Sequence, residues 1–295
     1  MQDKDYIVRA TAANGYVRAF AAVTTNMVND ARKVHELSPV AAVALGRTMT
    51  AAAIMSQFSK SPTDTLTLQI RSDGPLGGIV VVADANSNVK GYVYNPKVYL
   101  PLNEAGNFDV GKAVGKNGYL NVIKDFGLKE PYIGYVKLVS GEIGEDIAYY
   151  FVCSEQVPSA VSLGVLVGED ENVLNAGGFI IQLMPDADES IISYLEDKIN
   201  NLPPITKMLS QGKTPENILE EILGEKGLKI LEKAECQYKC NCSRERMRRN
   251  LISLGKGEIE DMIKEQHGAE VECHFCNTKY NFSEEELREL VENLT

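Results

Sequence analysis

The sequence predicts an α+β protein with a large N-terminal mixed α/β domain, a helical linker and a small, cysteine-rich C-terminal domain. Strand-like runs alternate with a few helical ones over residues 1–184, without a regular βαβ rhythm. Short amphipathic helical segments follow over residues 185–230, and five of the six cysteines lie beyond them, in the region 231–295. These three stretches are the predicted domains.

Composition limits the classes of partner. The 295 residues are 44% hydrophobic, enough for a sizeable core, and the net charge is −11. An acidic chain is poorly suited to nucleic acid or to an anionic membrane surface. We expect a cytoplasmic protein, because the N-terminus lacks a signal-peptide core and clustered cysteines are typical of metal or redox chemistry in a reducing compartment.

The N-terminal domain is predicted to begin with a β-hairpin. Two apolar runs between Tyr6 and Val23 are separated by Asn14-Gly15, the strongest short-range hairpin signal. Ser38-Pro39 then opens a helix that runs to about Phe58. That helix is mostly alanine and other small apolar residues interrupted by Arg47, so we expect it to be buried in the core and not to span a membrane.

The rest of this domain alternates between strands and helices. Strands are predicted at 65–71, 79–83, 89–94, 133–139, 147–154 and 178–184, and helices before Asp125 and at 158–167. The loop 73–78 is rich in glycine, but it lacks the lysine of a phosphate-binding loop and is interpreted as a turn.

The linker is predicted to contain three short helices, at 189–202, 205–210 and 214–223. Thr214 and Pro215 provide an N-cap and a first helical residue for the third. Such short amphipathic helices are marginal in isolation, so we expect their folded state to depend on a neighbouring surface.

Four cysteines form the strongest motif in the chain. A Cys-x-Cys pair, Cys240-Asn-Cys242, is followed, after thirty intervening residues, by a Cys-x-x-Cys pair, Cys273-His-Phe-Cys276. Four thiolates are the ligand set that tetrahedral zinc prefers. We therefore predict a zinc-binding domain with helices at 244–254, 257–266 and 284–294 and a hairpin at 271–282. At about 60 residues its own core is small, and metal is expected to supply much of its stability.

The same sulfurs permit a second interpretation. A Cys-x-x-Cys pair closes readily into a disulfide, whereas a Cys-x-Cys disulfide is strained and easily reduced. The cluster can therefore be a structural clip or a redox sensor. Arg244–Arg249 and the helix that starts after Cys242 are expected to lower thiol pKa values and favour oxidation, although the same run can also be a solvated basic face.

The remaining candidate ligands are less favoured. Cys236 is expected to be a spare thiol, and Cys153 an inert residue of a buried strand. His267 and His274 lie near the motif but are expected to be surface residues. Nothing in the sequence pairs a nucleophile with a base, so we predict no enzymatic activity.

The cysteine motif, together with Tyr280 and Phe282, closely resembles the zinc centre of the thirty-three-kilodalton heat-shock chaperonin family, whose members are redox-regulated holdases. The segments 71–78 and 176–178 extend the resemblance over essentially the whole chain. It implies that Cys240, Cys242, Cys273 and Cys276 bind zinc in the reduced, inactive protein. It also implies that oxidation pairs Cys240 with Cys242 and Cys273 with Cys276, and releases zinc.

The resemblance further implies that the zinc unit and linker then unfold, that unfolding client proteins are bound without ATP, and that the active form is a homodimer. Two other functions remain open. A nucleic-acid-binding zinc protein would use Arg244–Arg249. A thiol–disulfide oxidoreductase would need a thioredoxin-like βαβ context, which the sequence lacks.

Overall fold

The structure is a computed structural model that describes residues 4–294, and it combines helices and sheets as the sequence predicts. Contacts divide the chain into two compact units, with the division between Lys239 and Cys240. This division lies beyond the boundary expected at residue 231, because the intervening residues pair with strands of the first unit.

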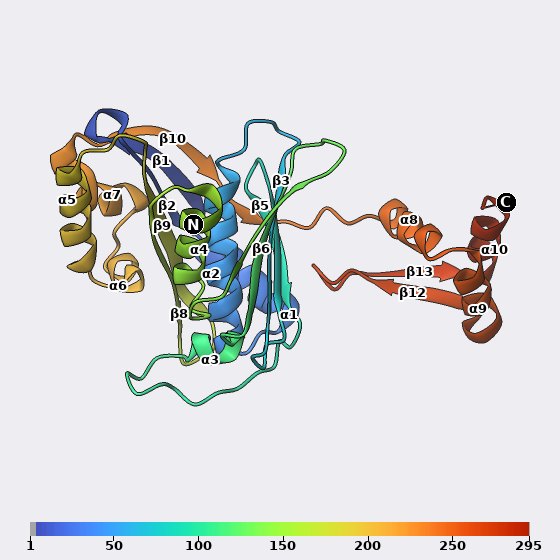
Figure 1. Cartoon of the computed structure of the whole chain (residues 1–295). Helices are drawn as coiled ribbons and strands as arrows, with labels where there is room; N and C mark the ends of the chain where they lie inside the picture. The colour runs from blue at the N-terminus through green and yellow to red at the C-terminus, as the bar shows by residue number, and fades with distance from the viewer. Residues whose placement is uncertain (1–3, 295) are drawn as a thin grey trace. The chain divides into compact units, whose positions relative to one another are not determined.

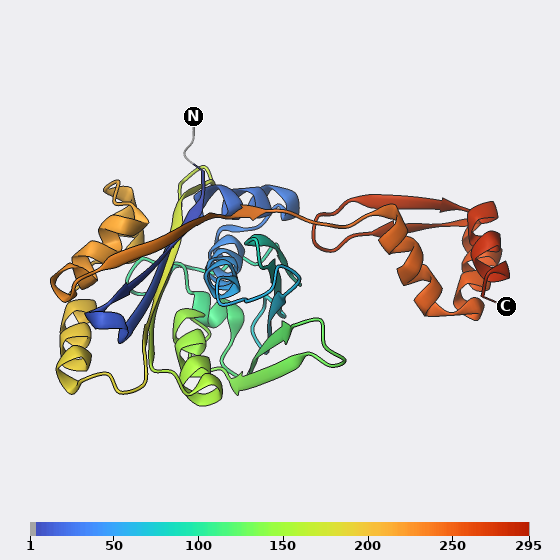
Figure 2. The ribbon, with the colours of Figure 1, turned by 90° about the horizontal axis from the view of Figure 1, so that it is seen from above.

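The first unit is built on two largely antiparallel sheets (Figures 1 and 2). One has five strands in the order β10-β1-β2-β9-β8, and the other has six in the order β11-β5-β4-β3-β6-β7. The strands of the five-stranded sheet are β1 (Tyr6–Ala12), β2 (Val17–Val23), β8 (Ser159–Val167), β9 (Val173–Leu183) and β10 (Lys229–Glu235). Those of the six-stranded sheet are β3 (Thr65–Ser72), β4 (Ile79–Asp84), β5 (Asn88–Val93), β6 (Gly118–Asp125), β7 (Tyr132–Lys137) and β11 (Gln237–Tyr238).

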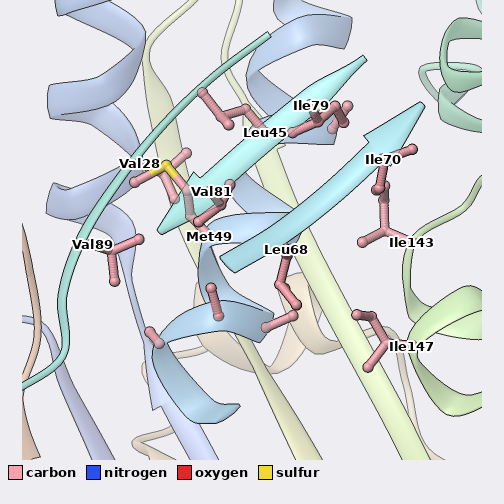
Figure 3. Packing of buried hydrophobic residues seen from close by; sticks show 14 of the residues in the cluster. Val28, Leu45, Met49, Leu68, Ile70, Ile79, Val81, Val89, Ile143 and Ile147 are labelled. Carbon is pink, nitrogen blue, oxygen red and sulfur yellow. The ribbon is translucent and has the colours of Figure 1, made fainter. Parts of the chain in front are cut away.

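Helix α2 (Pro39–Ser56) lies between the two sheets and forms the centre of the core (Figure 1). In the described part of the chain it is the one helix long and apolar enough to span a membrane, and 89% of it is buried inside the fold. Leu45 and Met49 of this helix pack with Leu68 and Val81 of the six-stranded sheet (Figure 3). The predicted buried helix is therefore confirmed.

Three shorter helices complete this core: α1 (Thr25–His35), α3 (Val110–Val114) and α4 (Gly144–Tyr150). Ile143 and Ile147 bring the start of α4 into the same apolar cluster (Figure 3). Asp146 fixes the turn before α4, because its carboxylate accepts hydrogen bonds from the backbone N–H groups of Val139 and Ile143 at 2.7 and 3.0 Å.

The predicted hairpin is confirmed: β1 and β2 pair antiparallel through a 3₁₀ turn, Ala13–Gly15. Alternate residues of these strands contribute to two different cores. Ile7 and Phe20 face α2, whereas Val8 and Ala19 belong to a separate apolar cluster on the opposite face of the sheet. The five-stranded sheet is therefore covered on both faces.

The linker helices cover the face of the five-stranded sheet that is opposite α2. They are α5 (Glu189–Asn200), α6 (Ile205–Ser210) and α7 (Pro215–Leu223), followed by a 3₁₀ turn, Gly224–Lys226. Leu195, Met208 and Leu219 are buried against the five-stranded sheet, and Thr214 caps α7 as predicted. The surface on which the linker was expected to depend includes this sheet.

The second unit contains α8 (Arg244–Leu254), α9 (Lys256–Gln266), the antiparallel hairpin β12 (Gly268–Glu272) with β13 (Lys279–Ser283), and α10 (Glu284–Glu292). These agree with the predicted elements to within a few residues. Ser243 caps α8 and Ser283 caps α10, so the sequence signals for helix starts were correct here.

Three predicted elements were wrong. The segment before Asp125 and the segment 158–167 were expected to be helical but are β6 and β8, since long-range pairing with β3 and β9 determines their conformation. The predicted strand 147–154 is α4 followed by a π-helical turn, Phe151–Glu155. Cys153 therefore lies in an exposed turn and is not a buried strand residue. Helix α1 was not predicted.

Candidate metal centre

The first cysteine pair lies at the entrance to α8. Cys240 and Cys242 precede the helix directly, and the side chain of Ser243 accepts a hydrogen bond from the Arg246 N–H at 3.2 Å. This cap ends the extended segment and starts the helix at a fixed point. The two sulfurs are consequently held on the short stretch between the first unit and α8.

The second pair lies in the turn between β12 and β13. The N–H groups of Cys276 and Asn277 donate to the Cys273 carbonyl at 3.1 and 2.7 Å, and Cys273 N–H donates to the Thr278 carbonyl at 3.0 Å. Asn277 has φ of 56°, a left-handed conformation that asparagine tolerates better than most residues. The turn thereby presents Cys273 and Cys276 together.

The fold brings the four predicted sulfurs into one cluster. All four lie within 4.8 Å of one another, and none is in a disulfide. Cys240 Sγ is 3.7 Å from Cys273 Sγ, and Cys242 Sγ is 3.3 Å from Cys276 Sγ. Four sulfurs bound tetrahedrally at about 2.3 Å from one zinc ion would be separated by roughly 3.8 Å. The donor set therefore fits a tetrahedral metal ion.

Burial opposes ionisation at three of the four thiols. Burial raises the pKa of Cys240 and that of Cys273. Burial also raises the pKa of Cys276, but hydrogen bonds with the side chain and backbone of Thr278, together with those to Cys242 and Cys240, outweigh burial and bring the value to about 7. Several like charges in one small site oppose one another, so a divalent cation is the natural partner of four thiolates.

Two hydroxyl groups also contact the sulfurs. Tyr280 Oη lies 3.1 Å from Cys242 Sγ, and Thr278 Oγ1 lies 3.2 Å from Cys276 Sγ. The hydrogen bond to Cys242, with burial, raises the pKa of Tyr280 to about 12. The sequence indicates Tyr280 only as part of the family resemblance and does not predict this contact, because no local pattern reveals which sulfur a strand residue faces.

The arginines of the segment 244–249 make contacts that differ from the expected interaction with the cysteine thiols. Arg244 forms an ion pair with Glu286 at 2.6 Å and lies over the Phe282 ring, 4.5 Å from its centroid. Arg246 donates to Asn241 Oδ1 at 3.3 Å. The prediction that these arginines lower the thiol pKa values was wrong for Cys240, where burial prevails, and at Cys276 the lowering comes mainly from Thr278.

The other candidate ligands lie outside the cluster. Cys236 is buried in the core of the first unit, where its S–H donates to the Val23 carbonyl at 3.8 Å. Burial raises the pKa of this thiol, so it is a poor nucleophile at neutral pH. His267 is exposed and lies 3.2 Å from Glu284, and His274 is also exposed.

The unit that carries the cluster has a small core. Its buried apolar side chains come from α8, α9, β13 and α10, and they are Met247, Leu251, Ile259, Ile263, Phe282, Leu287 and Leu290. Cys242 and Tyr280 pack against this group. The sulfur cluster is thus continuous with the only apolar cluster found among residues 240–294.

Comparisons with known proteins agree with this arrangement. The family model described as Hsp33 protein matches residues 5–283. A 33 kDa chaperonin of Acetivibrio thermocellus is 64% identical over 98% of this chain and 97% of its own length, and one of Ruminiclostridium cellulolyticum is 56% identical over 97% and 98%.

A solved structure is also similar. The crystal structure of the 33 kDa chaperonin (heat shock protein 33 homolog) of Thermotoga maritima matches with a TM-score of 0.90 and 44% identity, covering 99% of both chains. The family model, the curated relatives and the solved structure all extend over nearly the whole sequence. The chain therefore belongs to the Hsp33 chaperone family.

Proposed function

We propose that this protein is a redox-regulated, ATP-independent holdase. Reduced, it binds zinc through Cys240, Cys242, Cys273 and Cys276 and is inactive; oxidised, it binds unfolding proteins and prevents their aggregation. The single observation that supports this most strongly is the four-sulfur cluster, carried by a unit whose apolar core is small. The chaperonin names of its relatives support the same class of activity.

Bound Zn²⁺ would hold the four thiolates together and offset their mutual repulsion. Structural zinc contributes about 10–16 kcal/mol of apparent binding free energy at neutral pH, and a whole domain is typically stable by only about 5–15 kcal/mol. The cysteine side chains thus link both halves of the second unit, from α8 to the β12–β13 turn. Losing that link is expected to unfold the unit.

Oxidation removes the ligands. A thiolate of one pair attacks the O–O bond of peroxide, giving a sulfenic acid and one water, and the second thiol of the pair then displaces the other oxygen as water. Each disulfide therefore consumes one peroxide and two thiols. We propose the pairs Cys240–Cys242 and Cys273–Cys276, because the members of each pair are close neighbours in sequence and their sulfurs already lie within 4.8 Å of each other.

The client surface proposed here includes the linker and the sheet beneath it. Helices α5–α7 bury Leu195, Met208 and Leu219 against the five-stranded sheet. The segment that joins α7 to Cys240 contains β10, an edge strand whose residues are mostly exposed. If unfolding of the second unit frees β10 and then the helices, two apolar faces become available to unfolded protein.

We further propose that the active protein is a cytoplasmic homodimer and that it holds clients without catalysing a reaction. Unfolded polypeptides are its partners, and neither nucleic acid nor a membrane is required. The nucleic-acid alternative depends on Arg244–Arg249, of which Arg244 and Arg248 lie within 4.0 Å of glutamate side chains. A salt-dependent gel shift with single- and double-stranded DNA and RNA tests it.

The test of the main proposal is aggregation of a thermally unfolding protein, followed by light scattering. Zinc-loaded, reduced protein should not suppress scattering, whereas protein treated with peroxide at mildly raised temperature should suppress it. The Cys153→Ser variant is the matched control, since Cys153 is exposed but lies outside the cluster. Equal suppression by the reduced, zinc-bound protein would contradict the proposal.

A further inference from the structure

Each cysteine pair has one sulfur next to a hydroxyl group. Tyr280 Oη lies 3.1 Å from Cys242 Sγ, and Thr278 Oγ1 lies 3.2 Å from Cys276 Sγ. Both hydroxyls belong to the same short segment, which leads from the second cysteine pair into β13. No hydroxyl contact of this kind is found for Cys240 or Cys273 within residues 4–294.

The direction of these hydrogen bonds follows from the state of the sulfur. A cysteine that binds a metal ion does so as a thiolate, which has no proton to donate. The hydroxyl must then be the donor and the sulfur the acceptor. A hydrogen bond to a charged acceptor is stronger than one between neutral groups, and it withdraws electron density from the sulfur.

The fold holds the Tyr280 hydroxyl in place. Tyr280 lies on β13 opposite Val271 of β12, and its side chain is half-buried against the apolar core of the second unit. Phe282, two residues further along, shares this face of the hairpin and is buried. The phenol ring is therefore anchored by packing, and little conformational freedom remains for the hydroxyl to lose. Thr278, by contrast, is exposed.

We propose that Tyr280 is a positioning residue that sets the oxidation threshold of the cluster by donating a hydrogen bond to the Cys242 sulfur. The donated proton makes this sulfur a weaker nucleophile toward peroxide and retains it as a metal ligand. Thr278 is expected to have the weaker effect on Cys276, because its side chain is exposed to competing water and the geometry favours the Cys276 S–H as donor to Thr278 Oγ1. The inference rests on the proposed function, since it concerns the sensitivity of the same switch.

Two alternative explanations for the contact between Tyr280 and Cys242 are an electrostatic effect of Arg244 and simple packing of the tyrosine ring. Arg244, a basic residue two positions after Cys242, is already paired with Glu286 at 2.6 Å. The ring of Tyr280 contributes to packing, but packing alone does not require an oxygen 3.1 Å from a sulfur. Removing only that oxygen therefore separates the two roles.

The experiment uses the full-length, reduced, zinc-loaded protein with a Tyr280→Phe substitution. Two rates are followed after addition of peroxide: zinc release, with a chromophoric chelator, and loss of free thiols. Loss of one hydrogen bond to a charged sulfur should raise both rates by roughly tenfold and weaken zinc affinity in the absence of oxidant. Tyr135→Phe is the matched control, because Tyr135 is an exposed tyrosine of the first unit and its rates should be unchanged.

A second pair of variants tests the hydroxyl at Thr278. Thr278→Ser keeps the oxygen and should behave as the parent protein, whereas Thr278→Val, of similar shape, should release zinc roughly twofold faster. Replacing Tyr280 by 3-fluorotyrosine keeps the ring and strengthens the donor, so it should slow release. This replacement decides the question if Tyr280→Phe disturbs folding, because loss of packing cannot slow oxidation.

The outcomes separate this inference from the proposed function. The parent protein can release zinc on oxidation while the Tyr280→Phe and 3-fluorotyrosine proteins release it at the same rate. In that case the inference about Tyr280 is wrong and the proposed redox-regulated function is unaffected. If the parent protein holds no zinc, or keeps it during oxidation, the proposed function fails first and the inference with it.

Discussion

The interactions that stabilise the fold differ between the two compact units. The first encloses α2 between two sheets and buries a second apolar layer under α5–α7, so it has an extensive apolar core. The second buries only a short set of apolar side chains, and its four cysteines connect segments that are far apart in the sequence. The comparison indicates where a bound metal ion would contribute most to stability: in the unit whose apolar core is small.

The largest expected effect is loss of a cysteine ligand. Cys273→Ser should prevent tight zinc binding and unfold the second unit, because the free energy of metal binding, about 10 kcal/mol or more, exceeds what its core can supply. Limited proteolysis should then cleave beyond Lys239 and leave the first unit intact. Cys153→Ser should show neither change, and a Cys273→Ser protein that resists cleavage would refute the division of roles between the units.

The next effect is on the linker. Ile218 is fully buried under the five-stranded sheet, so Ile218→Asp places a charge in an apolar layer, at a cost of several kcal/mol, and should release α7. Client binding should then occur without oxidant while zinc remains bound, as measured by light scattering and metal analysis. Glu220→Gln, on the exposed side of α7, is the control. If the Ile218→Asp variant still requires oxidant to bind clients, the apolar face beneath α7 is not the client-binding surface.

Core truncation sharpens the comparison further. Leu287→Ala and Leu68→Ala remove side chains that are both fully buried, one in each unit, and each should cost about 2–5 kcal/mol. In the second unit this loss should also accelerate zinc release, because folding and metal binding are coupled. In the first unit it should lower the denaturation midpoint and leave zinc release unchanged. Equal effects on zinc release would show that the units are not independent.

The smallest effect concerns pH. Burial raises the pKa of Asp5, in the first unit, from 3.8 to about 6, although the Asn26 and Met27 N–H groups at 3.1 and 2.6 Å favour its charged form. A carboxyl with a raised folded-state pKa is more easily protonated in the folded than in the unfolded chain. Its contribution to stability is therefore present below about pH 4 and is lost as the pH rises through about 6.

Denaturant titration of the first unit at pH 5 and pH 7 measures this dependence. The parent protein should gain about 1 kcal/mol relative to Asp5→Asn as the pH falls between these values. The substitution removes the titration, so subtracting the two curves cancels the other carboxylates. Parallel curves would show that Asp5 does not titrate in this range.

The sequence predicts some regions of the protein better than others. Elements with local sequence signals are predicted correctly. Helix starts in the second unit and in the linker were predicted correctly, because Ser243, Thr214 and Ser283 signal them locally. The four cysteines were also found from spacing alone, and the fold brings them together. Local chemistry was sufficient in both cases.

Elements that depend on distant partners were not predictable. In β6, Leu120 and Val122 alternate with polar residues, but the alternation is short, and pairing with β3 makes it a strand. The opposite error occurred at 147–154, where aromatic and branched residues favour a strand locally. There Ile147, Tyr150 and Phe151 share one helical face that packs into the core, so tertiary contacts prevail over propensity.

One determination addresses the central idea directly: the zinc content and the number of free thiols, counted on the same full-length sample before and after peroxide. Our account predicts about one tightly held zinc in the reduced sample, and, after treatment, loss of that zinc together with four of the six thiols. A reduced sample without zinc, or an oxidised one that has lost those thiols and still retains the metal, would contradict it.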